Sequence, residues 1–401
     1  MSASNTLSDP DVFSECLYEK LEQINPGVEE LELYEFRYAL HNTYPQPGGW
    51  DAVKLDSEQD VEQRINTRDF YTSIQLKPRV GDRIVLDENI VRLTNMLFVG
   101  LVTGEYSEEW VQAHFYFDLR GFFFLTRTVY FTDAVLAHFG GRPWKSFEQK
   151  QKRFERYQAI GYKDFKAANA EVDQAFSESV QKLVAAKGTP LLLTLAGPTA
   201  AGKTEIVARL RCSFEQMGCQ VASIEMDNFL LDNDYRDDKG LHTLGKEAYH
   251  FDPFMESLEK IIHGQPIIIP RYDSTISSHD LDGRLKPGHI PRTIEPADII
   301  FLEGNFPFQS QEVTDLIGIK IVYLTDDAIR LKRKWKRDID YRKKYDPSYF
   351  RNRFFRTQFL RAQDCYRSQM QVCDMVVDTT SAAIWATPDI ARFLSSGPAC
   401  S

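Results

Sequence analysis

Short apolar runs recur through the second half of the chain. They fall at residues 191–197, 220–226, 266–270, 298–304 and 319–325. Continuous apolar runs of this length are typical of strands that are buried on both faces of a sheet. Stretches with helical spacing lie between several of these runs, such as 204–217 and 253–263. Because strand and helix alternate, the pattern predicts an α/β fold with a doubly wound parallel sheet.

The first half of the chain lacks this alternation and mixes aromatic-rich runs with turn signals. The segments TSIQLKPRV and DRIVLDE alternate apolar and polar residues and predict two strands around a turn at Gly81. Residues 146–187 are rich in charge and contain few helix breakers, so they predict a helical connector that ends at Gly188. We therefore expect two domains: an extra, mixed α+β domain over residues 1–187 and the α/β domain over residues 188–401.

One apolar segment, residues 113–141, has the composition of a membrane span but not its charge pattern. The charged residues that interrupt it are Asp118, Arg120, Arg127 and Asp133. A spanning helix needs roughly 20 residues with few charges, so the segment predicts a buried core element instead. The N-terminus shows neither the basic region nor the apolar core of a secretory signal. We expect a cytoplasmic protein with no membrane partner.

Composition and charge narrow the function classes. Of the 401 residues, 43% are hydrophobic and 26% are charged, which excludes a wholly disordered or fibrous protein. The formal net charge of −10 disfavours a general nucleic-acid binder, because phosphate neutralisation needs a basic surface. The six cysteines form no CxxC pair, which argues against a zinc knuckle or a disulfide scaffold.

A glycine-rich sequence, GPTAAGKT, follows the first apolar run and precedes a helical pattern. It fits the phosphate-binding pattern GxxxxGK[ST], with the strand and the helix that this pattern requires. The glycines let backbone N–H groups point at phosphate oxygens, and the helix N-terminus adds partial positive charge. Lys203 can reach the β- and γ-phosphates, and the Thr204 hydroxyl can bind Mg²⁺. The residues predicted to bind a nucleoside triphosphate are Gly197, Pro198, Thr199, Ala200, Ala201, Gly202, Lys203 and Thr204.

Two carboxylates follow apolar runs at the same predicted sheet edge. Asp227 comes directly after 220–226, and Glu303 lies near the end of 298–304. Catalytic groups collect where parallel strands end, although an aspartate there can also be an ordinary turn residue. Asp227 could accept the proton of an acceptor hydroxyl. Together with Thr204, the two carboxylates would form an oxygen-rich site that suits Mg²⁺.

A basic run occupies residues 330–356 in an otherwise acidic chain. It holds 12 lysines and arginines against three aspartates, which gives a local charge of +9. Such clustering indicates an anionic ligand at this place. An arginine-bearing helical lid could close over a triphosphate and stabilise the transferring phosphoryl group. A solvated helix face and a local RNA-binding patch are the alternatives.

The ordered set of motifs GPTAAGKT, MDNF, PRYDSTISSHD, DIIFLEG and IRLKRKWKRDIDYR resembles that of the uridine kinase and phosphoribulokinase family. The resemblance covers about residues 190–380 and implies a P-loop kinase that transfers the γ-phosphoryl group of ATP to a hydroxyl. It implies that Asp227 accepts the proton of the acceptor and that Glu303 lies near the metal. The residues that it places at the acceptor or on the lid are Tyr272, Arg337 and Arg342.

The sequence departs from the family pattern mainly where the acceptor is held. Leu230 replaces an aromatic residue. Ser277 stands where the family has a histidine, and His279 follows two residues later. Lys334 replaces a lid arginine, and a lysine cannot make the bidentate contact of an arginine. The residues expected to hold ATP are kept, so the departures concern the acceptor rather than the reaction.

These features predict a kinase of a small molecule that uses ATP and Mg²⁺, with Asp227, Lys203 and Arg337 as catalytic residues. A nucleoside is the leading acceptor, followed by a sugar phosphate or a pantothenate-like alcohol. The alternative of a different class is an ATP-binding switch, which would need no acceptor base. Residues 1–187 could regulate, oligomerise or help to select the acceptor, and a homo-oligomer stays open.

Overall fold

In the computed structural model, the described part of the chain forms two compact units. Described residues up to Val129 belong to the first unit, and those from Tyr130 onward belong to the second. This division falls earlier than the boundary near residue 187 that the helical connector predicts. The structure describes residues 3–24, 28, 32–41, 43–67, 69–70, 77–80, 83–85, 87–118, 123–126, 129–147, 169–241, 245–270, 291–325, 330, 333, 337 and 362–396.

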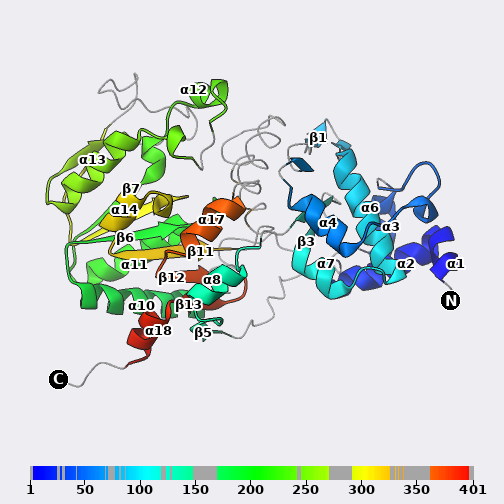
Figure 1. Cartoon of the computed structure of the whole chain (residues 1–401), viewed down its shortest axis with the longest axis horizontal. Coiled ribbons are helices and arrows are strands. Elements are labelled where there is room, and N and C mark those ends of the chain that lie inside the picture. The colour runs from blue at the N-terminus through cyan, green and yellow to red at the C-terminus, as the bar shows by residue number, and fades with distance from the viewer. Residues whose placement is uncertain are drawn as a thin grey trace. The chain divides into compact units, whose positions relative to one another are not determined.

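The first unit is mainly helical, with two short antiparallel hairpins (Figure 1). Its α-helices include α1 (Ala3–Ser8), α2 (Pro10–Ile24), α3 (Leu33–Leu40), α4 (Glu58–Ile65), α6 (Glu88–Thr103) and α7 (Glu108–His114). Its hairpins join β1 (Lys77–Val80) to β2 (Arg83–Val85) and β3 (Phe115–Asp118) to β4 (Phe123–Thr126). Trp50 is buried in the core and stacks on Phe13 with 4.2 Å between ring centroids. The two strands expected around Gly81 are thus present as β1 and β2, while Gly81 itself lies outside the described residues.

The apolar segment 113–141 does not form one continuous helix. Its described residues belong to α7, β3, β4, α8 (Asp133–His138) and the loops beside α8. Phe115, Val135 and Phe139 are buried, as expected of core elements. Among the described residues, no helix combines the length and the hydropathy that crossing a membrane requires.

The second unit is built on a seven-stranded sheet with the order β5-β13-β12-β11-β6-β10-β7. Its parallel strands are β6 (Leu191–Ala196), β7 (Val221–Glu225), β10 (Ile299–Gly304), β11 (Ile319–Leu324) and β12 (Met375–Asp378). The antiparallel strands β13 (Ala383–Ala386) and β5 (Lys145–Ser146) extend one edge. Four of the five parallel strands coincide with predicted apolar runs, which confirms the doubly wound α/β prediction.

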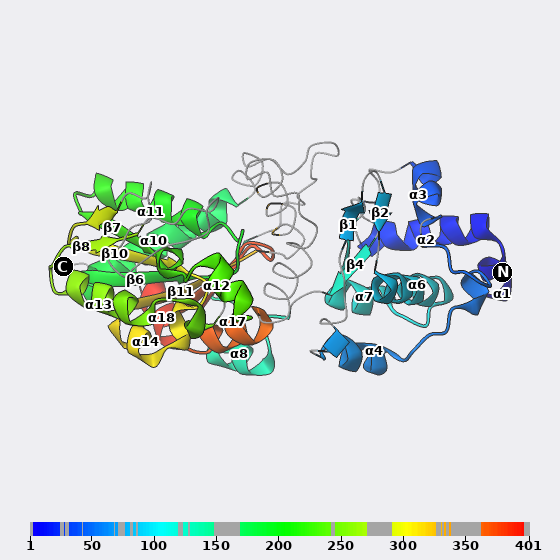
Figure 2. The same cartoon turned by 90° about the horizontal axis from the view of Figure 1, so that it is seen from above.

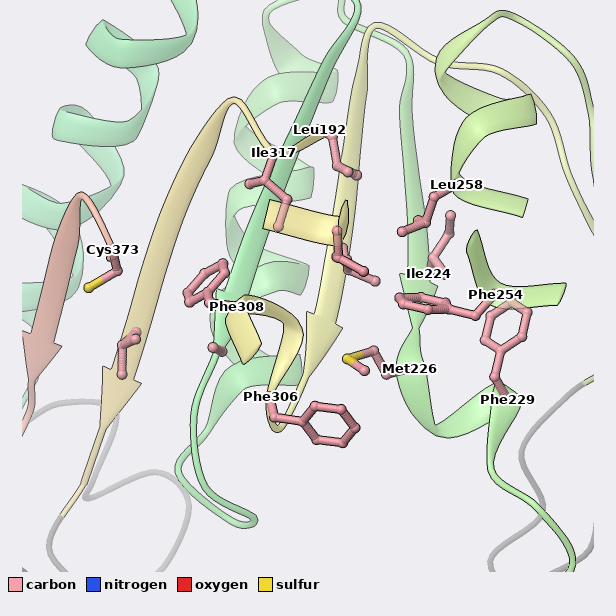
Figure 3. Packing of buried hydrophobic residues seen from close by; sticks show 14 of the residues in the cluster. Leu192, Ile224, Met226, Phe229, Phe254, Leu258, Phe306, Phe308, Ile317 and Cys373 are labelled. Carbon is pink, nitrogen blue, oxygen red and sulfur yellow. The ribbon is translucent and has the colours of Figure 1, made fainter. Parts of the chain in front are cut away.

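Helices cover both faces of this sheet because successive strand residues point to opposite sides. Figure 2 shows α10 (Ala170–Lys187) and α11 (Lys203–Gln216) on one side of the strands. The other side carries α8, α13 (Phe251–Ile262) and α14 (Gln311–Leu316). Leu193 and Phe301 point into the core beneath α10 and α11, whereas Leu192 and Ile300 point into the core on the opposite face of the sheet. Figure 3 shows part of the core on this opposite face, which includes Leu192, Ile224 and Phe254.

The apolar run 266–270 does not enter the main sheet, which corrects the expectation of a strand buried on both faces. It forms β8 (Ile267–Ile269), which pairs antiparallel with β9 (Arg292–Ile294) in a separate two-stranded sheet. Ile267 and Ile269 are buried, whereas Ile268 between them is 71% exposed. The run consists of only three isoleucines between prolines, so it is too short for its composition to distinguish a central strand from a half-exposed one.

The expected connector helix over 146–187 is present in part. Its described helical portion is α10, which begins at Ala170 and ends before Gly188. Lys145 and Ser146 form the edge strand β5, and residues 148–168 lie outside the described part of the chain. Apolar residues along α10 are buried against the main sheet, so α10 belongs to the sheet core.

Candidate active site

The carboxyl ends of β6 and β10 lie at the switch point of the sheet topology. These two strands are hydrogen-bonded neighbours, paired in register over six residues. After β6 the chain enters α11 on one face of the sheet. After β10 it continues through Phe306 and Phe308 into the core of the opposite face. Neighbouring strands whose connections leave on opposite faces form a crevice at their carboxyl ends, and ligands of such sheets bind there.

Two glycines shape the loop 197–202 that leads from β6 to α11. Gly197 has a φ of +154° and Gly202 a φ of +107°, which residues with side chains rarely adopt. A Cβ atom on Gly197 would lie 2.3 Å from the carbonyl oxygen of Tyr323 on β11, so only glycine fits there. The loop therefore turns tightly against β11 and brings the N-terminus of α11 to the crevice, where helix N–H groups can bind an anion.

Lys203 begins α11 and is only 8% exposed. Its Nζ donates hydrogen bonds to the carbonyl oxygens of Gly197, at 2.7 Å, and Pro198, at 3.1 Å. Burial lowers the pKa of Lys203, while the carboxylates of Glu303 and Asp227 act in the opposite direction. The ammonium group is thus held inside its own loop by two carbonyl oxygens, and a bound phosphate would add to the stabilisation of its charged form by the two carboxylates.

Thr204 and Glu303 meet across the crevice. The Thr204 hydroxyl donates a 2.5 Å hydrogen bond to Oε1 of Glu303, which joins the start of α11 to the end of β10. Burial raises the pKa of Glu303, and Lys203 and the Thr204 hydroxyl partly offset that rise. The structure therefore brings together two of the three predicted magnesium ligands, although they lie 99 positions apart in the sequence.

Asp227 lies on the other side of Glu303, in the short helix η3 (Met226–Phe229) that follows β7. β7 pairs with β10 so that Glu225 stands opposite Glu303, and Asp227 comes two residues later. The negative charge of Asp227 helps to raise the pKa of Glu303, so the two carboxylates are electrostatic neighbours. In the described part of the chain, no three His, Cys, Asp or Glu side chains form a metal cluster. A Mg²⁺ ion here would take Thr204, phosphate oxygens and water besides the carboxylates, as this ion commonly does.

A second close approach joins η3 to β10. A Cβ atom on Gly304 would lie 2.3 Å from Sδ of Met226 and 2.7 Å from its Cγ. Figure 3 shows the Met226 side chain beside the end of β10. Because Met226 precedes Asp227, this contact sets how near Asp227 stands to the end of β10.

Three arginines of the basic run contact the loop that precedes α11. Arg330 and Arg337 donate to the carbonyl oxygen and the Oγ1 of Thr199, at 3.3 Å and 3.2 Å. Arg333 donates to the carbonyl oxygen of Ala200 at 3.1 Å, and burial lowers its pKa. Sequence reasoning singled out Arg337 but missed Arg330 and Arg333. Their i, i+3 and i+7 spacing, which places all three on one helix face, is the signal that could have found them.

Other predicted residues lie outside the described part of the chain. They are Tyr272, Ser277, His279, Lys334 and Arg342. Tyr249 and His250 are described and border η3: Leu230 forms a β-bridge with Tyr249, and the N–H of His250 donates to the carbonyl oxygen of Phe229 at 2.8 Å. Leu230, one of the departures from the family pattern, therefore directly follows the short helix that carries Asp227.

Comparisons with known proteins identify relatives of the second half of the chain. Residues 192–384 match the phosphoribulokinase / uridine kinase family. A uridine kinase of Streptococcus agalactiae is 30% identical over 158 residues, which cover 38% of this chain and 70% of that protein. Uridine kinase-like protein 3 of Arabidopsis thaliana is 28% identical over 159 residues, 38% of this chain and 31% of that protein.

Solved structures that match part of the chain include one titled a possible uridine kinase from Bacillus stearothermophilus. Its TM-score is 0.33 at 18% identity, covering 45% of this chain and 94% of that chain. A phosphoribulokinase from Rhodobacter spheroides has a TM-score of 0.36 at 16% identity, covering 48% of this chain and 70% of that chain. With its family match and its streptococcal relative, the chain belongs to the phosphoribulokinase / uridine kinase family.

Proposed function

We propose that the protein transfers the γ-phosphoryl group of ATP to a hydroxyl group of a small molecule. The observation that carries this proposal is the hydrogen bond between Thr204 and Glu303, formed beside the buried Lys203. An anion cradle, a hydroxyl and a carboxylate at one strand edge are the parts that hold a triphosphate and its metal. Asp227 adds a carboxylate that could accept the proton of an acceptor hydroxyl.

The residues present fit both ATP and Mg²⁺. Lys203 and the N–H groups at the start of α11 would bind the phosphates, and Thr204, Glu303 and Asp227 supply hard oxygen ligands. Bound Mg²⁺ would neutralise negative charge on the phosphates. Arg330, Arg333 and Arg337 stand against the loop and could stabilise the charge of the transferring group, as the lid hypothesis requires.

A nucleoside is the acceptor that we favour, because curated relatives such as the streptococcal protein are named uridine kinases. A sugar phosphate or a pantothenate-like alcohol is the second choice, since the acceptor segment departs from the family pattern. A switch without transfer would need no acceptor base, which is the role proposed for Asp227. This carboxylate favours an enzyme over a switch.

ADP release with ATP and Mg²⁺ across a panel of acceptors tests the proposal. The panel should contain uridine, cytidine, other nucleosides, ribulose 5-phosphate, pantothenate and glycerate. We expect release that depends on one acceptor class and falls by about 100-fold or more in Asp227→Asn, the range that a general base contributes.

The Asp227→Asn variant should still bind ATP, because its charge lies outside the loop that holds the phosphates. Asp238→Asn, a change at an exposed aspartate of α12 (Asn233–Asp238), is the matched control and should keep full activity. Equal activity of Asp227→Asn and wild type would refute the base assignment. Binding of ATP without release for any acceptor would favour the switch.

A further inference from the structure

Asp173 is a buried carboxylate behind the phosphate-binding loop, in a helix that precedes the family-matched residues 192–384. It lies in the first turn of α10 and is 5% exposed. Its Oδ1 accepts a hydrogen bond from the Tyr323 hydroxyl at 3.0 Å. Its Oδ2 accepts one from Nη1 of Arg209 at 2.5 Å. A single carboxylate thus joins three elements, because Tyr323 is on β11 and Arg209 is on α11.

Tyr323 lies beside both ends of the phosphate-binding loop. Its carbonyl oxygen is the atom that leaves no room for a side chain on Gly197. The Cε1 atom of its ring lies 3.7 Å from the position of a Cβ atom on Gly202. Gly197 and Gly202 bound the turn that aims N–H groups into the crevice, so the place of Tyr323 sets the shape of this turn.

Arg209 provides the second connection, through the helix that begins with Lys203 and Thr204. It lies six positions after Lys203 on α11, and its guanidinium group is held by Asp173. Asp173 therefore fixes the strand beneath the loop and the helix beyond the loop relative to each other.

We propose that Asp173 is a positioning residue for nucleotide binding, which holds the phosphate-binding loop in its competent shape through Tyr323 and Arg209. The inference rests on the proposed function, since it assumes that the loop binds ATP. A buried carboxylate is stable only when its oxygens accept hydrogen bonds, and Asp173 has both partners that this requires. Burial and the neighbouring carboxylate raise the pKa of Tyr323, so its hydroxyl stays protonated and remains a donor.

Two variants of the full chain test the proposal. Asp173→Asn keeps the size of the side chain but replaces one of its two acceptor oxygens with an NH₂ group. Either Tyr323 or Arg209 then donates toward a group that cannot accept. Tyr323→Phe removes only the hydroxyl and serves if the first variant does not fold. We expect the Kd for Mg-ATP, measured by calorimetry, to rise about tenfold in Asp173→Asn. The free energy of one hydrogen bond to a charged group corresponds to a change of about this size in an equilibrium constant. A smaller rise is expected in Tyr323→Phe.

Kinetics separate positioning from general loss of stability. We expect KM for ATP to rise with Kd, while KM for the acceptor and kcat at saturating ATP change little. Phe214→Leu is the matched control: Phe214 is buried near the far end of α11, 6.3 Å from the ring of Phe301, so it should lower Tm without raising Kd. Arg211→Ala, at an exposed ion pair with Glu215 on the same helix, should change neither.

Wild-type affinity in both Asp173→Asn and Tyr323→Phe would overturn the proposal and leave the proposed function intact. A wild-type chain that binds Mg-ATP but transfers no phosphoryl group would overturn the proposed function alone, because the comparison of Kd values would still decide the role of Asp173. A rise in Kd for Phe214→Leu as large as that for Asp173→Asn would also refute the specific role of Asp173.

Discussion

Lys203 and Glu303 carry charges that the fold alone does not favour. Burial lowers the pKa of the lysine and raises that of the glutamate, so each charged form is less stable here than in water. The two groups partly compensate each other, since each appears among the causes that oppose the other's shift. A site that keeps such charges before its ligand arrives gives up stability for binding, as is common at functional sites.

Glu303→Gln should therefore make the chain more stable near neutral pH while abolishing phosphoryl transfer. The folded-state pKa of Glu303 lies above its ordinary value of 4.5, so the folded protein binds this proton more tightly than the unfolded chain does. The corresponding stability is fully present below pH 4.5 and is lost as pH rises through the raised value. Urea unfolding at a series of pH values should show that the free energy of unfolding of the variant exceeds that of the wild type by an amount that grows as the pH rises through this window.

The control for this prediction is Glu259→Gln, at an exposed position of α13. It should leave the pH dependence of stability as in the wild type. An advantage of Glu303→Gln that does not change with pH would contradict the linkage argument.

At the scale of elements, the contact between Gly304 and Met226 keeps β10 and η3 together. Gly304→Ala would place a methyl group inside the van der Waals radius of Met226 and push η3, with Asp227, away from the crevice. We expect kcat to fall on the order of tenfold or more, because small misplacements of catalytic groups are costly. Kd for ATP should change less, since the loop 197–202 is not displaced.

A second change can relieve this clash. Met226→Ala removes the atoms that the new methyl group would meet, so the double variant Gly304→Ala/Met226→Ala should recover part of the kcat lost in Gly304→Ala. Assays of ADP release would measure kcat for the wild type, the single variant and the double variant. A double variant no more active than Gly304→Ala would show that the contact does not position Asp227.

The elements that could be predicted from the sequence are those whose pattern is local. Continuous apolar runs predict four of the parallel strands, and a motif between a strand and a helix predicts the phosphate-binding loop. The antiparallel strands β5 and β13 have two and four residues, too few for a periodic signal. β8 carries an apolar run but lies outside the main sheet, because its pairing with β9 depends on tertiary context.

Site residues follow the same division. Lys203, Thr204 and Glu303 could be placed because each stands at a fixed offset from a strand end. Asp173 could not, since an aspartate in a charged helix is indistinguishable from a solvated one until its burial is known. Arg330 and Arg333 reach the loop 197–202 only because the chain returns to it more than 100 residues later, as the sequence separation of 131 for Arg330 and Thr199 records.

At the scale of the whole molecule, the sheet unit draws on residues well before the phosphate-binding loop. β5 pairs with β13, so residues 145–146 complete the sheet edge. The Nε2 atom of His138 lies 2.8 Å from the carbonyl oxygen of Cys373, and the indole N–H of Trp144 donates to Oγ of Ser395. These contacts attach α8 and the residues beside β5 to the C-terminal part of the chain, so the unit that carries the site begins near Tyr130.

Two fragments test where this unit begins. A fragment 188–401 lacks α10, so the face of the sheet that α10 covers would be exposed. The larger apolar residues that α10 buries there are Val172, Phe176, Val180, Leu183 and Val184. Their burial is worth on the order of 10 kcal/mol, as much as the whole stability of an ordinary domain. We expect fragment 188–401 to be aggregated or unfolded, and fragment 130–401 to unfold cooperatively and bind Mg-ATP. Equal thermal midpoints for the two fragments would place the start of the folding unit at residue 188 after all.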